Sequence, residues 1–302
     1  MRKKCSYFQC LSATTLVSIF GLVILGGIVR VTESGLGCPD WPLCHGRIIP
    51  PADLHTLIEY SHRLLGLFVG VLVFITAVVA YRCYRDKTWI VFPAFLGLFL
   101  VIGQGFLGGV TVLTELKGSI VTVHLALAEI IIAIFTMLCL ASWRGMCFTM
   151  SRTNKIAVSS SVAVVFAYIL LLSGSYVTTS GSAGACNEWP FCQDGKLIFG
   201  ERLADIHMLH RFSVVIMVTI ISYVGRKIWM SSQSGDGLQR VSIVTAVILL
   251  GQVAVGAFVV WTGLSVIISV LHLALATGFW MSVVSLALWP YTGNKQLGVI
   301  PS

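Results

Sequence analysis

Long apolar segments alternate with short polar ones along the whole chain. A helix needs about 20 apolar residues to cross the hydrocarbon core of a bilayer. Runs of about this length or longer lie near residues 11–31, 59–81, 88–112, 119–142, 156–178, 206–225, 241–262 and 266–289. The pattern therefore predicts an all-α integral membrane protein with eight transmembrane helices.

The first apolar run follows the charged start Met1-Arg2-Lys3-Lys4, as the core of a signal peptide would. It continues too long for a signal peptide, and no Ala-x-Ala cleavage site follows it. We therefore expect it to be retained as the first span. The chain shows no Arg- and Ser-rich transit peptide, which favours a bacterial or archaeal plasma membrane over a mitochondrial inner membrane.

Composition and charge agree with this setting. Hydrophobic residues make up 57% of the chain and charged residues only 11%, against about 25% charged in a typical soluble domain. With eight spans, thirteen basic residues fall on the side of the termini: Arg2, Lys3, Lys4, Arg82, Arg85, Lys87, Arg144, Arg152, Lys155, Arg226, Lys227, Arg240 and Lys295. Five fall on the other side: Arg30, Arg47, Lys117, Lys196 and Arg202.

This asymmetry sets the expected orientation. Cytoplasmic loops carry the excess of Lys and Arg, so we expect both termini in the cytoplasm and the long loops after spans 1 and 5 outside it. The net charge of +8 then reflects membrane topology, and we expect no nucleic-acid partner.

The chain contains an internal repeat with a constant shift. The loop "ESGLGCPDWPLCHG" (33–46) returns as "GSAGACNEWPFCQD" (181–194), a shift of 148 residues. The same shift maps Gly103-Gln104 onto Gly251-Gln252, and "HLALA" occurs at both 124–128 and 272–276. Each unit holds four spans, an even number, so both units keep one orientation. We predict two tandem four-helix bundles, residues 1–150 and 151–302, related by a pseudo-twofold axis along the membrane normal.

Four of the seven histidines occupy repeat-related positions within predicted spans: His62 maps onto His210, and His124 onto His272. An ionisable residue within a span is costly and is by default a functional candidate. For any one of them a hydrogen-bonded core histidine is the alternative. Each lies a few residues below the outer end of its span, so we expect His62 to face His124, and His210 to face His272.

Two facing imidazoles in a dry bundle favour haem over other metal groups. Zinc normally takes four ligands, and bare copper sites add Cys or Met, neither of which recurs at these positions. Haem iron needs two axial ligands, and its apolar ring suits a bundle interior. Small residues would let helices and a flat ring approach closely, with ordinary helix packing as the alternative. The residues concerned are Gly66, Gly103, Gly105, Gly108 and Gly109. Arg63 and Arg211, each beside a ligand candidate, are candidate propionate partners or interface anchors.

The two halves differ at one position of chemical interest. Glu59 precedes His62 by three residues, on the same helix face, whereas the shift of 148 places His207 at the equivalent position. The Glu-x-x-His spacing also occurs in di-iron carboxylate bundles, but these need it twice with two further Glu residues, and the second copy is missing here. A carboxylate in one half and an imidazole in the other suggest that the first half carries out the reaction and that the second half holds a supporting site. Glu129, another carboxylate within a span, is a buried hydrogen-bonded group or part of a proton path.

The two cysteine loops raise three alternatives. Cys38 and Cys44 are too widely spaced for the short Cys-x2-4-Cys knuckle of a zinc site. Both loops are expected on the side where disulfides persist, so we favour structural disulfides Cys38–Cys44 and Cys186–Cys192, with redox-active pairs as the alternative. Each loop would then cover the outer mouth of a haem site.

The stretches "GGIVRVTESGLGCPDWPLCHG" (26–46) and "IEYSHR" (58–63), together with the repeated histidines, resemble the haem A synthase family of cytochrome oxidase assembly. The resemblance covers nearly the whole chain. It implies an oxidoreductase that converts a ring methyl group of haem O to a formyl group by successive hydroxylations, giving haem A.

The resemblance also implies roles for individual residues. A cofactor haem b would be ligated by His210 and His272 in the C-terminal half, and the substrate haem would lie near His62 and His124 in the N-terminal half. Glu59 matches the family's glutamate, and would help oxidise the methyl carbon by stabilising a cationic intermediate or managing its proton. The resemblance gives His207 no role.

Partners and competing functions follow from the same resemblance. It implies delivery of haem O by haem O synthase and of haem A to cytochrome oxidase, with an unidentified electron-transfer partner; a homo-oligomer is also considered. A dihaem b-type electron-transfer cytochrome is the main alternative, but it has no need for Glu59. The other alternative is a transporter or assembly factor without a redox cofactor, which predicts a colourless purified protein.

Overall fold

The computed structural model describes residues 2–145, 155–197, 200–231 and 235–292. Within these ranges it has eight α-helices: α1 (Arg2–Val31), α2 (Leu54–Tyr84), α3 (Thr88–Leu113), α4 (Gly118–Arg144), α5 (Lys155–Thr179), α6 (Arg202–Met230), α7 (Asp236–Trp261) and α8 (Val266–Leu288). Each is long and apolar enough to cross a membrane, which confirms the predicted spans. Arg152 and Lys295, used above for orientation, lie outside the described residues.

Several helices extend beyond the apolar runs that predicted them. Helix α2 begins five residues before the predicted 59, because the Asp53 side chain caps it by accepting a hydrogen bond from the Thr56 amide at 3.1 Å. Helix α6 continues to Met230 rather than 225 and includes Arg226 and Lys227 near its end. Long basic side chains can keep their charges at the membrane surface while the backbone stays helical.

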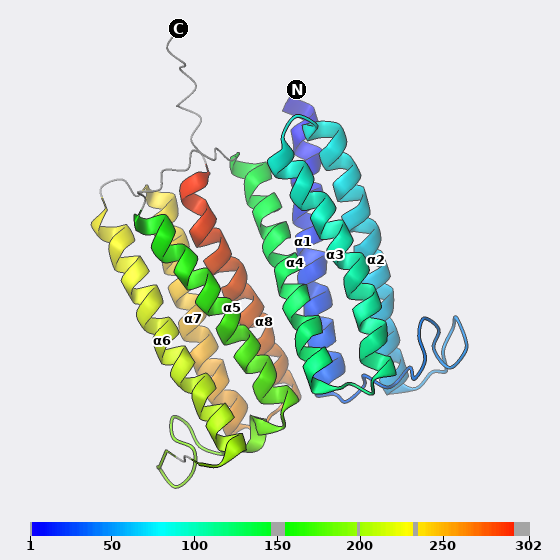
Figure 1. The fold of residues 1–302 in the computed structure, drawn as a ribbon, viewed down its shortest axis with the longest axis vertical. Helices are drawn as coiled ribbons and strands as arrows, with labels where there is room; N and C mark the ends of the chain where they lie inside the picture. Colours follow the sequence, from blue (N-terminus) through cyan, green and yellow to red (C-terminus); the bar gives the residue numbers. More distant parts are fainter. Residues whose placement is uncertain (1, 146–154, 198–199, 232–234, 293–302) are drawn as a thin grey trace.

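The helices stand side by side, with α1 to α4 in one part of the molecule and α5 to α8 in the other (Figure 1). In the first group each helix packs against the next, and α4 closes the ring on α1. The second group repeats this order, with α8 closing on α5. Helices α2 and α4 therefore lie diagonally across the first group, and α6 and α8 across the second. The groups meet where α8 contacts α1 and α4, and where α4 contacts α5.

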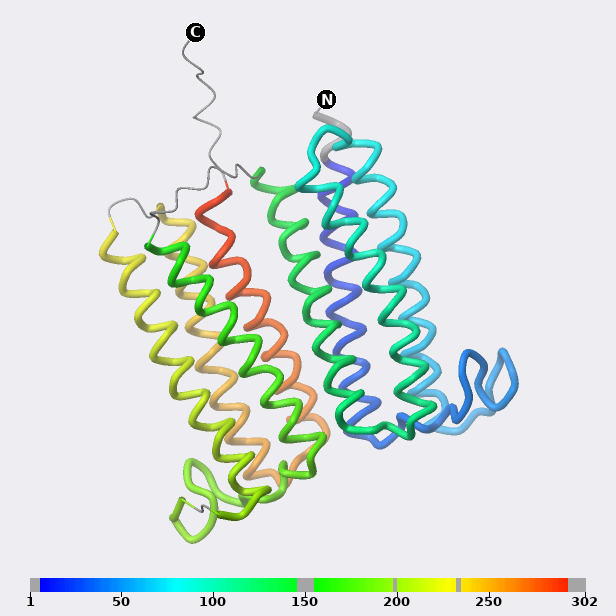
Figure 2. The backbone as a smooth tube through the Cα atoms, in the orientation of Figure 1, coloured from blue at the N-terminus to red at the C-terminus, as the bar shows by residue number. Residues whose placement is uncertain are grey.

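The two cysteine loops lie at the same end of the molecule, opposite the start of α1 and the end of α8 (Figure 2). Large apolar side chains cover the outer helix faces, and Phe68, Phe92, Phe99 and Phe106 are each more than half exposed. Such faces are unfavourable in water and suit contact with lipid.

Candidate functional site

The four repeated histidines lie in pairs on diagonal helices. His62 is on α2 and His124 on α4, which lie diagonally across the first group. His210 on α6 and His272 on α8 form the corresponding pair in the second group. The residues of each predicted pair thus lie on diagonal helices of one group.

Each imidazole rests against a glycine of a neighbouring helix. The Cε1 atoms of His62 and His124 would lie 3.1 and 3.3 Å from a Cβ built on Gly26 and Gly108. The equivalent distances in the second group are 3.1 Å from Gly174 to His210 and 2.9 Å from Gly256 to His272. Any side chain at these glycines would displace the ring. The glycines therefore form a cradle that sets where each imidazole lies.

Sequence reasoning found Gly108 but missed Gly26 and Gly174. The two are themselves separated by 148 residues, so the repeat shift was the signal that could have found them. By contrast Gly66, Gly103 and Gly105 have no atom near the position of a Cβ. Open space beside these three residues is compatible with the approach of a flat ligand.

The buried imidazole nitrogens are only partly satisfied by protein groups. Within the described part of the chain, Nδ1 of His62, His124 and His272 is buried without a hydrogen-bond partner. Leaving a buried polar atom unpaired costs about 1–3 kcal/mol. A metal bound through Nδ1 would satisfy that atom, whereas a metal bound through Nε2 would leave the Nδ1 N–H without an acceptor.

The second pair has hydrogen bonds that the first lacks. Nδ1 of His210 lies 2.8 Å from the Ser173 hydroxyl, while residue 25, the equivalent of Ser173 in the first half, is leucine. Nε2 of His272 lies 3.3 Å from the Gln252 amide nitrogen, whereas Gln104 donates to the backbone carbonyl of His124 at 2.8 Å. Ser173 was not anticipated from the sequence, because the repeat does not include it.

Among the described residues there is no group of three or more His, Cys, Asp or Glu side chains that could hold a metal ion. A four-ligand zinc site and a di-iron carboxylate site both require such a group. A group held by two imidazoles fits the pairs better. Haem, with two axial positions and an apolar ring, fits the paired imidazoles and the glycine cradles.

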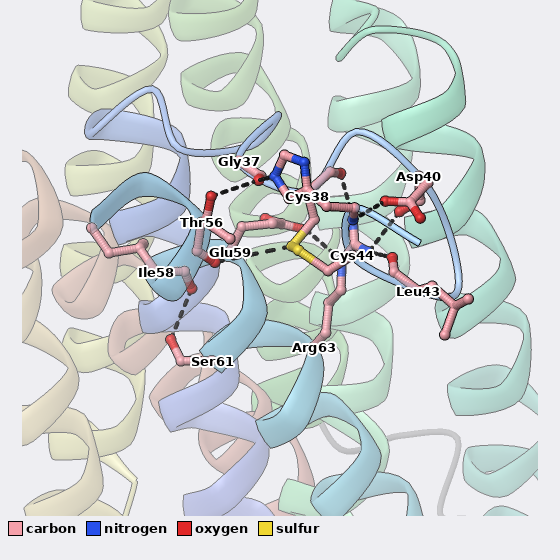
Figure 3. Close-up of polar contacts among 11 residues, drawn as sticks. Gly37, Cys38, Asp40, Leu43, Cys44, Thr56, Ile58, Glu59, Ser61 and Arg63 are labelled. Carbon is pink, nitrogen blue, oxygen red and sulfur yellow. Dashed lines mark hydrogen bonds and ion pairs between the residues drawn. A yellow bond between two sulfur atoms is a disulfide. The ribbon is translucent and has the colours of Figure 1, made fainter. Parts of the chain in front are cut away.

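Arg63 contacts both Glu59 and the first cysteine loop, residues 33–46 (Figure 3). Glu59 is 5% exposed. Its Oε1 accepts a hydrogen bond from Nε of Arg63 at 3.0 Å, and the two side chains form an ion pair through this contact. The rest of the Arg63 guanidinium donates to loop carbonyls, at 2.7 Å to Asp40 and Leu43 and at 2.9 Å to Cys38. The loop is therefore fastened to α2 at Arg63, the residue next to His62.

The second cysteine loop, residues 181–194, is fastened in the same way by Arg211. Its Nη1 donates to the carbonyls of Glu188, Pro190 and Phe191, and its Nη2 lies 3.3 Å from Nε2 of His207. Nδ1 of His207 lies 3.1 Å from the Ser182 carbonyl, which can only accept. His207 is therefore protonated at Nδ1 and accepts from Arg211 at Nε2, so a neutral acceptor replaces the carboxyl group of Glu59.

Both loops contain the expected disulfides. Cys38–Cys44 and Cys186–Cys192 have Cα atoms 4.7 and 4.3 Å apart, and all four cysteines are buried. In the first loop, Asp40 accepts from the amides of His45 and Gly46 at 2.6 and 2.8 Å. The hydrogen bond from the Gly46 amide is the main cause that holds the pKa of Asp40 below its usual value. The loop is thus internally braced as well as attached to α2.

Trp41 lies over α3 next to one of the histidine cradles. A Cβ on Gly109 would come within 2.7 Å of the indole, and the ring also contacts Phe106 at a centroid distance of 6.0 Å. The position equivalent to Gly109 is Ala257, and there Trp189 contacts Trp261 instead. The first loop thus brings its tryptophan close to α3, beside the residue that supports His124.

Comparison with known proteins connects this arrangement to one family. The family model COX15-CtaA, described as cytochrome oxidase assembly protein, matches residues 9–56 and 53–284. A Heme A synthase of Halalkalibacterium halodurans is 30% identical over 268 residues, covering 85% of this chain and 89% of the relative. Heme A synthases of an Exiguobacterium species and of Exiguobacterium sibiricum are each 26% identical, covering 92% and 98% of this chain and 90% and 98% of the relatives.

Proposed function

The chain belongs to the COX15-CtaA family of cytochrome oxidase assembly proteins, and from this premise we propose that it is a haem A synthase. It is an oxidoreductase that oxidises a ring methyl group of haem O to a formyl group by successive hydroxylations. The relatives that cover most of this chain are named Heme A synthase. The product, haem A, serves cytochrome oxidase.

We assign the oxidation to the first half, residues 1–150. The observation that carries this assignment is Glu59, a carboxyl group buried one helical turn from His62 and beneath the first cysteine loop. The second half has His207 at the same position. Substrate haem O would lie between His62 and His124, supported by the cradles at Gly26 and Gly108.

The chemistry expected of Glu59 follows from its charge and surroundings. Each oxidation step would take two electrons from the methyl carbon, which would pass to the separate redox partner proposed below, and would release protons as positive charge develops at that carbon. A carboxylate stabilises that charge more strongly in a water-poor site than in water. Glu59 can also take up the proton as a general base. We therefore propose Glu59 as the catalytic residue.

We assign a resident haem b to the second half, residues 151–302, with His210 and His272 as its iron ligands. The bound haem supplies one-electron chemistry. The hydrogen bond between Ser173 and His210 would fix the orientation of that imidazole, a role that residues behind a metal ligand commonly have. Arg63 and Arg211 remain candidate propionate partners, through the N–H groups that the loops leave free.

We propose a plasma-membrane location with both termini in the cytoplasm and both cysteine loops outside it. The excess of basic residues on the side of the termini supports this orientation. Haem O is apolar and would reach the protein from haem O synthase within the membrane. Haem A would pass to cytochrome oxidase, and a separate redox partner would exchange electrons. A homo-oligomer is compatible with this arrangement.

A dihaem b-type electron-transfer cytochrome would use the same four histidines, but it would not require Glu59. Expression in cells that make haem O but no haem A, followed by chromatography of extracted haems, separates the two functions. A haem A synthase produces haem A in these cells. Bound haem B without any haem A would favour the cytochrome, and a colourless purified protein would exclude both.

A further inference from the structure

We propose that Arg63 is a positioning residue for oxidation, which fixes the Glu59 carboxyl group and couples it to closure of the first cysteine loop. This inference rests on the proposed function, because it assumes that Glu59 takes part in the reaction. It goes beyond that function by giving Arg63 a role other than contact with a haem propionate.

The hydrogen bonds of the guanidinium carry the argument. An arginine side chain has five N–H groups in a rigid planar fork. Four of them are used here, one by Glu59 and three by the carbonyls of Cys38, Asp40 and Leu43. One N–H group on Nη2 remains for any other partner. The arrangement thus binds the loop and the carboxyl group at once.

Burial makes this connection strong and specific. The side chains of Glu59 and Arg63 are 7% and 15% exposed, so solvent screens their ion pair only weakly. Residues four apart lie on one face of a helix, and the pair therefore keeps its geometry as long as α2 does. Only Oε1 of Glu59 accepts from Arg63. Within the described residues Oε2 accepts no hydrogen bond, which leaves it free to act on the substrate.

The first cysteine loop must be closed for this geometry to exist. Its three carbonyls come from residues on and between the two disulfide-bonded cysteines, so the disulfide holds the acceptors together. If the loop opens, Arg63 loses three of its acceptors and is free to leave Glu59. Closure would therefore orient the carboxyl group only when the mouth of the site is covered.

The second half provides an internal comparison. Arg211 donates to the loop carbonyls of Glu188, Pro190 and Phe191, and its fourth contact is with neutral His207. Fastening of the loop is thus common to both halves, and only the first half adds a carboxyl group. This supports a separate function for the contact between Arg63 and Glu59.

The test compares E59Q, R63A and the double variant E59Q/R63A in purified full-length protein. Two quantities are measured by chromatography of extracted haems: substrate-haem content, and the fraction of substrate haem converted to haem A. We expect R63A to keep its haem content within about twofold and to lose at least about tenfold in conversion. The double variant should convert no less than E59Q alone, because Arg63 acts through Glu59.

Two further variants separate positioning from general loosening of the loop. D40A removes the side chain that braces the loop but keeps the Asp40 carbonyl, the disulfide and Arg63, so we expect it to lower conversion less than R63A does. R63K keeps the charge without the planar fork, and we expect conversion between those of R63A and the parent. If R63A does not fold, the test rests on R63K. Conversion by R63K at least about threefold below that of the parent protein, at unchanged haem content, supports the proposal.

Four results would overturn the proposal while the proposed function stands. These are unchanged conversion in both R63A and R63K, loss of haem content with unchanged conversion per bound haem, additive losses in the double variant, and a D40A defect equal to that of R63A. Normal conversion by E59Q would instead refute the role of Glu59, and with it the positioning role.

Discussion

The Thr277 hydroxyl donates a hydrogen bond of 2.8 Å to Oε1 of Glu129, and these two residues are separated by the repeat shift of 148. Two other contacts join residues with the same separation. Arg30 donates to the Thr178 carbonyl at 3.3 Å, and Nε of Arg144 donates to the Thr292 hydroxyl at 2.9 Å. Arg30 and Thr178 join α1 to α5, and the other two contacts join α4 to α8 and to the residues that follow it. The three contacts therefore hold the two halves together.

Glu129 is a buried acid at the junction of the halves, and among the described residues its carboxyl group has one side-chain donor, Thr277. It is 0% exposed, and within the described residues its Oε2 has no hydrogen-bond partner. Trp280 binds the backbone carbonyl of Glu129, not its carboxyl group. The contact thus gives Glu129 a structural role at the junction of the halves.

We expect T277V to destabilise the protein by about 1–3 kcal/mol, because it leaves the carboxyl group of Glu129 without its donor. Thermal unfolding in detergent measures the change. T245V is the matched control, since the Thr245 hydroxyl is equally buried but bonds only to the Val241 carbonyl of its own helix. Equal destabilisation by the two substitutions would show that the contact between the halves adds nothing.

The glycine cradle of the second half yields a spectroscopic prediction. A Cβ on Gly256 would come within 2.9 Å of the His272 ring, so G256A should displace the imidazole and alter or abolish the reduced b-type spectrum. H272A should abolish it. G225A on α6 is the control, because no atom lies within 4 Å of its Cβ position. A G256A spectrum identical to that of G225A would contradict the ligand assignment.

Membrane orientation can be tested at the two ends of α3. Asp86 and Lys117 are both exposed, one before the helix and one after it. In intact cells a membrane-impermeant maleimide should label K117C and not D86C, because we expect only the loop after α3 to face the outside. Labelling above the background of the parent protein is the measured signal. The reverse pattern would invert the proposed topology.

The sequence allowed prediction of the elements that depend on local pattern. The eight spans follow from apolar length, and the constant shift of the repeat identified the histidine pairs. The start of α2 was predicted too late, because the cap at Asp53 lies outside the apolar run. Helix starts set by a single polar contact are not visible in an average of hydrophobicity.

The contacts of Arg63 could not be predicted for a different reason. Its partners are backbone carbonyls of the first cysteine loop, and every residue has a carbonyl. Which of them face an arginine depends on the path of the loop, which no residue type encodes. From the sequence, Arg63 could be a propionate partner or an interface anchor, and the structure adds contacts with the loop and with Glu59.

The central claim is that the first half oxidises substrate haem with the help of Glu59. The most direct measurement is the haem content of purified E59Q and parent protein, each produced with haem O available, by chromatography of the extracted haems. We predict haem A with the parent protein, and with E59Q retained haem O or a partly oxidised haem with at least about tenfold less haem A. Equal yields of haem A from the two proteins would contradict the account.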